Sequence, residues 1–279
     1  MLDFSFCLLT ALLECIGELL EVVEPPLRRE LVLVLPDLVV DGQHASAVDL
    51  LANLLENDSQ FTAPVLESLS SLHLDKEAED NVCKLVTRSV ASAKPSDLPC
   101  ILRFLLQHLT NENANEVTTA LRHGLSQELL SGNETTTPAA SADEALILDA
   151  ILSSLRLRND LGMLLVTQLE GVKKATDHKP IDWWLTCALT AAGDAKSRAR
   201  SSKMLNDKAS KQLIHPGLLK QAIRGHGVAL KPHYQLQLSL AGALVRNPTS
   251  VTARHVGGAV YTLLFEEYAE PYERQEMIG

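Results

Sequence analysis

Short apolar runs that repeat with the period of an α-helix follow one another along most of the chain. Leu98, Ile101, Leu102, Leu105 and Leu109 occupy positions i, i+3, i+4, i+7 and i+11, so they form one continuous helical face. The same periodicity recurs over three later segments, 161–172, 181–192 and 256–268. The pattern predicts a chain of amphipathic helices, each with one face to bury.

Prolines, glycines and small polar residues divide these runs at short intervals. Pro25-Pro26 predicts the start of a helix and Asp41-Gly42 the end of one. Only 234–240, "YQLQLSL", alternates with a period of two, and it leads directly into apolar residues at helical spacing, which favours a helix there as well. We expect roughly fourteen helices of ordinary length, joined by loops of a few residues.

Many short amphipathic helices without strands predict an all-α fold. They bury their faces most simply when antiparallel pairs stack into an α-solenoid. The sequence matches neither the tetratricopeptide nor the ankyrin consensus, and its loose spacing is closer to that of degenerate HEAT or armadillo repeats. A compact all-α bundle is the alternative.

One segment differs from the rest in composition and predicts a flexible linker. Residues 132–143 are rich in threonine and alanine, contain Pro138 and lack apolar periodicity. They divide the chain into an amino-terminal helical segment, 1–131, and a second helical segment, 144–279. The second segment stops where a further helix is beginning, so we expect the chain to be part of a longer protein.

Charge is distributed unevenly on the two sides of this linker. The formal net charge is -10, but residues 1–140 contain 8 basic and 21 acidic side chains, whereas 141–279 contain 17 and 14. Within the second segment, 171–255 contains 14 basic and 4 acidic side chains. A concentrated basic block in an acidic chain indicates an electrostatic partner for that region.

The basic block predicts a ridge that follows the backbone of a nucleic acid. Lys196, Arg200 and Lys203 lie at i, i+4 and i+7 of a predicted helix, and further cations flank them or follow on the next helix. Aromatic residues make up only 4% of the chain, which favours backbone contacts to duplex DNA over base stacking. A solvated helix face that meets an acidic protein partner is the alternative. The candidate residues are Lys196, Arg198, Arg200, Lys203, Lys208, Lys211, Lys220 and Arg224.

Catalytic, metal and cofactor motifs are missing from the sequence. It contains no phosphate-binding glycine loop, no His-x-x-x-His or Glu-x-x-His pair and no Gly-x-Ser-x-Gly turn. The sequence therefore predicts no enzyme activity, no metal site and no cofactor. No stretch is long and apolar enough to cross a bilayer, which predicts no membrane contact.

The cysteines predict a reducing compartment. They are odd in number and widely spaced, and each has apolar neighbours in the sequence, so we expect small buried side chains without disulfides. The five are Cys7, Cys15, Cys83, Cys100 and Cys187.

Several collinear stretches resemble the amino-terminal helical region of the Fanconi anaemia complementation group D-two family. They include "LPDLVVDGQHASAVDLLANLLENDSQFTAPVLESLSSLHLD" (35–75), "DLPCILRFLLQHLT" (97–110), "DAILSSLRLRNDLGMLLVTQLE" (149–170), "DHKPIDWWLTCAL" (177–189) and "LLFEEYAEPYERQEMIG" (263–279). The basic block is the least similar part. These stretches are structural rather than catalytic signatures.

The resemblance implies a non-enzymatic α-solenoid scaffold that acts in the nucleus, on chromatin, in the repair of DNA interstrand crosslinks. Members of the family pair with the paralogous Fanconi group I protein, and the heterodimer clamps duplex DNA once ubiquitin has been attached to a specific lysine. In the family that lysine lies beyond the end of this chain. The alternative is a HEAT- or armadillo-like adaptor that binds a protein partner through its basic face.

Overall fold

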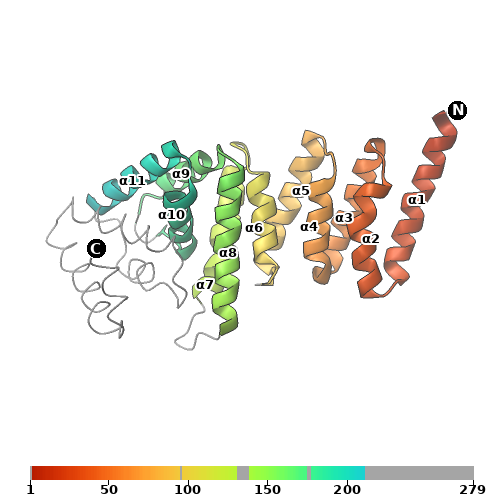
Figure 1. Cartoon of the computed structure of the whole chain (residues 1–279), viewed down its shortest axis with the longest axis horizontal. Helices are drawn as coiled ribbons and strands as arrows, with labels where there is room; N and C mark the ends of the chain where they lie inside the picture. Colours follow the sequence, from red (N-terminus) through yellow and green to blue (C-terminus); the bar gives the residue numbers. More distant parts are fainter. Residues whose placement is uncertain (1, 95, 131–137, 175–176, 211–279) are drawn as a thin grey trace. The chain divides into compact units, whose positions relative to one another are not determined.

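The computed structural model describes residues 2–94, 96–130, 138–174 and 177–210. This part of the chain contains eleven α-helices, three short 3-10 turns and no β-strand (Figure 1). The prediction of an all-α fold is confirmed. The helices expected over 234–240 and 256–268 lie outside the described residues.

The chain divides after His108 into two compact units. The first contains α1 (Leu2–Val22), α2 (Pro25–Leu38), α3 (His44–Asn57), α4 (Thr62–Ser71), α5 (Lys76–Ser89) and α6 (Leu98–Gln107). Three 3-10 turns join some of these helices, η1 (Asp41–Gln43), η2 (Ser59–Phe61) and η3 (Val90–Ser92). The second contains α7 (Ala114–Leu130), α8 (Pro138–Leu157), α9 (Leu161–Gly171), α10 (Pro180–Ala192) and α11 (Ala195–Ser210).

In the first unit, the main contacts of each helix are with helices one or two positions away in the chain. Helix α2 packs on α4, α3 packs on α4 and α5, and both α4 and α5 pack on α6 (Figure 1). Contacts restricted to near neighbours are typical of stacked helical arrays. The unit is therefore consistent with an α-solenoid, and the HEAT or armadillo type of its repeats stays a prediction.

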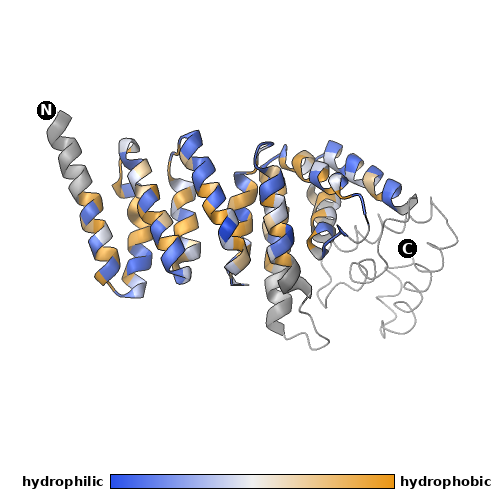
Figure 2. Ribbon diagram, turned by 180° about the vertical axis from the view of Figure 1, so that it is seen from behind, coloured by the Kyte–Doolittle hydropathy of each residue, from blue (hydrophilic) through white to orange (hydrophobic). Residues whose placement is uncertain are grey.

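The local sequence explains where the helices of the first unit begin and which faces they bury. Pro25 occupies the first position of α2, as predicted, because its fixed φ suits the start of a helix. Asp75 caps α5 by accepting a hydrogen bond from the backbone N–H of Ala78 at 2.8 Å. The predicted apolar face of α6 is buried, with both Leu102 and Leu105 at 0% exposure. Figure 2 shows apolar stripes of this kind running along the helices.

Helix α10 is the central element of the second unit, where it packs against α7, α8, α9 and α11. Its buried residues Ile181, Leu185 and Leu189 repeat at i, i+4 and i+8. Helices α9 and α11 approach closely where Gly162 meets Ser197, because a Cβ atom on Gly162 would lie only 2.6 Å from the Ser197 Oγ. This close approach fixes the position of α11, which carries the predicted basic ridge.

The predicted linker is helical in its second half. Helix α8 begins at Pro138, the favoured residue for a first helical position, and so includes residues 138–143 of the segment predicted as a loop. Residues 131–137 lie outside the described part of the chain. The boundary between the two compact units lies before α7 in the chain, whereas the sequence predicts a boundary after it. The division into an acidic and a basic segment stays a prediction.

The cysteines follow the burial prediction only in part. Cys83 is buried and Cys100 is half-buried, and burial raises the pKa of the Cys100 thiol to about 11. Cys15 is exposed, so the expectation that it is buried is wrong. Cys15 lies on the side of α1 away from Leu13 and Ile16, which face the core. In the described residues, no helix is long and apolar enough to cross a bilayer.

Two leucines on α2 provide a matched test of this packing. Leu35 is 0% exposed and Leu27 is 60% exposed. We expect Leu35→Ala to lower the free energy of unfolding by about 2–5 kcal/mol, because it removes buried methyl groups and leaves a cavity. Leu27→Ala should change it by about 0.5 kcal/mol or less. Urea unfolding followed by circular dichroism measures both, and equal losses would contradict the assignment of the α2 faces.

Candidate nucleic-acid interface

Helix α11 is the element that carries the predicted ridge, and an aspartate satisfies its amino-terminal backbone amides. The carboxylate of Asp194 accepts hydrogen bonds from the N–H groups of Ser197 at 3.0 Å and Lys196 at 3.1 Å. Since the positive end of the helix dipole is already matched by this carboxylate, attraction for further anions must come from side chains.

The predicted ridge residues differ in their exposure to solvent. Lys196, Arg198 and Lys203 are exposed, and within the described residues none of their three side chains forms a hydrogen bond or ion pair. Arg200 is half-exposed and Lys208 is buried. The remaining candidates lie outside the described residues: Lys211, Lys220 and Arg224.

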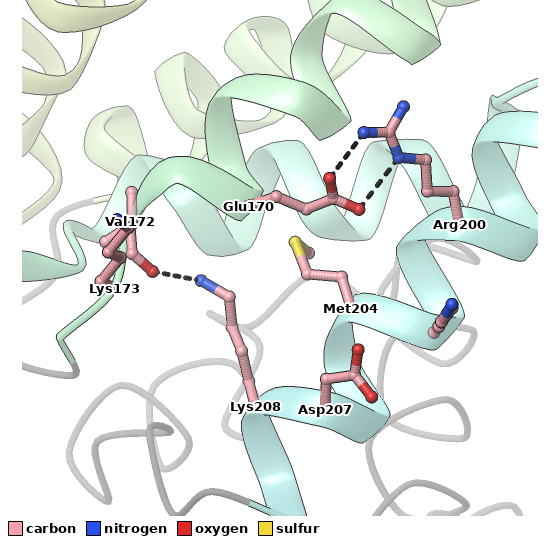
Figure 3. Close-up of a pocket in the computed structure, with 8 residues that line it drawn as sticks. Glu170, Val172, Lys173, Arg200, Met204, Asp207 and Lys208 are labelled. Carbon is pink, nitrogen blue, oxygen red and sulfur yellow. Dashed lines mark hydrogen bonds and ion pairs between the residues drawn. The ribbon is translucent and has the colours of Figure 1, made fainter.

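A groove of about 810 Å³ separates α11 from the carboxyl-terminal end of α9 and the residues that follow it (Figure 3). It brings together Arg200 and Lys203 of α11 with Lys173, a cation outside the predicted ridge. Four cationic and two acidic side chains contribute to its lining, so the groove is positively charged. The lining residues are Glu170, Val172, Lys173, Arg200, Lys203, Met204, Asp207 and Lys208.

Arg200 and Glu170 form a bidentate ion pair at the surface of this groove. The Arg200 Nε donates to Glu170 Oε1 at 3.0 Å and Nη2 donates to Oε2 at 2.6 Å (Figure 3). Hydrogen bonding to Glu170 raises the pKa of Arg200. About a third of each side chain remains exposed, so solvent screens the pair and its contribution to stability is small.

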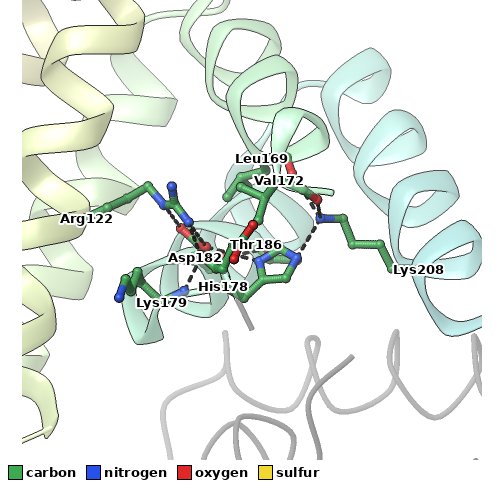
Figure 4. A network of polar contacts seen from close by, with 9 residues as sticks. Arg122, Leu169, Val172, His178, Lys179, Asp182, Thr186 and Lys208 are labelled. Atoms are coloured by element: carbon green, nitrogen blue, oxygen red, sulfur yellow. Dashed lines mark hydrogen bonds and ion pairs between the residues drawn. The ribbon is translucent and has the colours of Figure 1, made fainter. Parts of the chain in front are cut away.

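The ammonium of Lys208 points into the unit and holds the end of α9. Its Nζ donates to the carbonyl oxygens of Leu169 and Val172, each at 3.0 Å, and lies 2.7 Å from the Nε2 of His178 (Figure 4). Burial lowers the pKa of Lys208 to about 8, against the opposing effect of the Asp182 charge. All three contacts compete with a phosphate, so this geometry does not favour Lys208 as a direct ligand of DNA.

His178 connects Lys208 to a buried carboxylate. The Nδ1 of His178 lies 3.1 Å from an oxygen of Asp182 (Figure 4). Because Nε2 accepts from the Lys208 ammonium, a neutral ring with its proton on Nδ1 satisfies both contacts. The imidazole therefore relays hydrogen bonding from α11 to α10.

Asp182 is the centre of this buried network. Arg122 of α7 donates to both of its oxygens, at 2.8 and 3.0 Å, and the backbone N–H of Lys179 donates at 3.0 Å. Burial by itself raises the pKa of Asp182, but hydrogen bonds from His178 and Arg122 outweigh it and lower the pKa below its usual value. The Arg122 guanidinium also donates to the carbonyl of Asp177 at 2.6 Å. Side chains of three helices are thus joined around one carboxylate.

In the described residues, no group of three or more His, Cys, Asp and Glu side chains is arranged to hold a metal ion. The described part of the basic block is instead a charged surface on one helix, α11. Such a surface suits contacts to a polyanion, since the cations lie on one element that is fixed by buried neighbours.

A profile of the family described as "Fanconi anaemia protein FancD2 nuclease" matches residues 10–279. The chain belongs to the FancD2 family. The match covers nearly the whole chain, so the resemblance noted for the separate sequence stretches is confirmed.

Curated relatives agree with the FancD2 assignment. The chain is 24% identical to the Fanconi anemia group D2 protein of Gallus gallus over 280 residues. It is 25% and 23% identical to the group D2 protein homologs of Mus musculus and Rattus norvegicus, each over 281 residues. Each match covers 94% of this chain and 19% of the relative. The chain therefore spans about a fifth of the length of these FancD2 relatives.

Two lysines of α11 provide a matched test of which cation stabilises the fold and which lies only at the surface. We expect Lys208→Met to lower the free energy of unfolding by about 1–3 kcal/mol, because it leaves the carbonyls of Leu169 and Val172 and the Nε2 of His178 without their donor. Lys203→Met, which removes an exposed ammonium from the same helix, should change it by about 0.5 kcal/mol or less. Thermal unfolding of both variants measures the difference, and an unaffected Lys208→Met would contradict a structural role for the ammonium.

Proposed function

We propose that this chain is a helical scaffold segment that acts in the Fanconi pathway of DNA interstrand crosslink repair. The observation that supports it most directly is the family match over residues 10–279. The stacked helices of the first unit agree with this role, since near-neighbour packing gives a large surface for partners. The segment contributes shape and charge rather than chemistry.

The proposed protein partner is the paralogous Fanconi group I protein, with which the longer protein forms a heterodimer in the nucleus. This proposal rests on the resemblance to the family. In the family, the lysine that receives ubiquitin lies beyond the end of this chain, so we propose no lysine of this chain as the acceptor. The proposed role of ubiquitin is only as a modification of the longer protein.

The proposed nucleic-acid partner is duplex DNA, bound through the exposed cations of α11. Lys196, Arg198 and Lys203 present their charges to solvent, so phosphates can reach them without breaking a contact of these side chains within the described residues. Each neutralised phosphate releases condensed counterions, which favours binding at low salt and carries no sequence preference. Lys211, Lys220 and Arg224 remain predicted contributors. Lys208 is left out because its ammonium holds α9.

The family description contains the word "nuclease", whereas our proposal for this segment is binding without catalysis. The two differ in a measurable way. A nuclease would shorten a labelled duplex during incubation with Mg²⁺, while a scaffold segment would retain it at full length. The same preparation used for binding measurements can be tested for strand cleavage.

Charge reversal on α11 tests the DNA contact. We expect Lys196→Glu/Arg198→Glu/Lys203→Glu to weaken duplex binding at low salt by about tenfold or more. We also expect it to reduce the slope of log K against log salt by about 2–3, because three phosphate contacts are lost. Fluorescence anisotropy with a labelled duplex, repeated over a salt series, gives both quantities.

The matched control reverses three exposed cations of the first unit, Lys84, Arg88 and Lys94. It makes the same change in net charge away from α11, so it should leave most of the affinity intact. Equal losses in the two variants would show that only overall charge matters and would reject the α11 contact. A wild-type chain that binds an acidic protein but not the duplex would favour the adaptor alternative.

A further inference from the structure

We propose that Glu170 is an internal counter-ion that occupies the place of a DNA phosphate on Arg200. In this proposal, the groove between α9 and α11 is a phosphate-binding groove that is masked in the free protein. The proposal rests on the proposed function, in which α11 contacts duplex DNA. It adds a binding groove and a residue that restrains binding there.

The groove collects cations from two separate segments around one ion pair. Lys173 follows the end of α9, and Arg200 and Lys203 come from successive turns of α11. Lys173 and Lys203 are exposed, and their side chains form no hydrogen bond or ion pair within the described part of the chain. Both can therefore turn toward an anion in the groove. A phosphate at Arg200 would lie in a groove that these two lysines line together with the carboxylate of Asp207.

The carboxyl-terminal end of α9 does not oppose an anion in this groove. The last carbonyls of a helix form the negative end of its dipole and would repel a phosphate. Here the Lys208 ammonium donates to the carbonyls of Leu169 and Val172 at 3.0 Å each. The buried lysine therefore offsets the negative charge of two carbonyls at this end of α9.

The geometry of the Arg200–Glu170 pair is that of arginine bound to an oxyanion. Two parallel N–H···O bonds, 3.0 and 2.6 Å long, join the guanidinium to the carboxylate. Arginine binds phosphate oxygens through the same two-pronged arrangement. About a third of each side chain is exposed, so the pair is screened by water and can exchange at little cost. A phosphate would replace Glu170 without moving the guanidinium far.

Removal of the Glu170 charge tests this masking directly. We expect Glu170→Gln to raise the affinity for a fluorescein-labelled duplex by about threefold to tenfold, since Arg200 becomes available to a phosphate beside the two exposed lysines. We also expect the slope of log K against log salt to steepen by about 1, because one further phosphate is neutralised. Anisotropy titrations of the 279-residue chain over a salt series measure both values.

A second arginine–carboxylate pair in the same unit supplies the matched control. Asp160 pairs with Arg158 at the opposite end of α9 and is exposed. Asp160→Asn removes the same charge away from the groove, so it should leave the affinity close to that of the wild type. In the double variant Glu170→Gln/Arg200→Gln the gain should disappear, because the group that Glu170 masks is absent.

The outcomes separate this inference from the proposed function. Masking is supported if Glu170→Gln raises the duplex affinity more than Asp160→Asn does and if this gain requires Arg200. Equal affinities of these two variants would overturn it and leave the pair as a structural bridge, while the wild-type DNA affinity would stand. If neither the wild type nor Glu170→Gln binds the duplex in a salt-dependent way, both the masking inference and the proposed DNA contact are rejected. Competition by polyglutamate as strong as that by unlabelled duplex would also overturn it, in favour of an acidic protein ligand.

Discussion

The fold depends on one constraint, which is that an amphipathic helix cannot bury its apolar face alone. In the first unit the apolar stripes of α2, α4 and α6 are covered by helices one or two positions away, so packing advances along the chain. A structure built this way has a core that extends with each helix and a large surface for its length. Such a surface suits partner binding, and the family to which the chain belongs gives the partners a proposed identity.

The second unit adds a buried polar network to this packing. Burial makes unpaired charges costly, so the ammonium of Lys208, the carboxylate of Asp182 and the guanidinium of Arg122 each need their partners in place. His178 joins the first of these to the second. Because the network connects α7, α10 and α11, it fixes the helix that carries the surface cations. The buried charges thus position the exposed ones.

The sequence predicted the helices well because their periodicity is local information. The apolar spacing of α6 and the proline at the start of α2 needed no knowledge of distant residues. The sequence also located the basic helix, but not which of its cations reach solvent. A signal was present, since Lys208 continues the buried period of Ser201, Met204 and Leu205 on α11.

Other features of the site depend on contacts that no local pattern contains. Arg122 and Asp182 are 60 positions apart in the sequence, and Glu170 and Arg200 are 30 apart. We propose that this segment is a scaffold surface for a protein partner, and the decisive experiment is size-exclusion chromatography with light scattering of the chain mixed with the Fanconi group I paralogue. We expect one peak whose mass is the sum of the two chains. Two peaks that elute as the separate proteins do would contradict it.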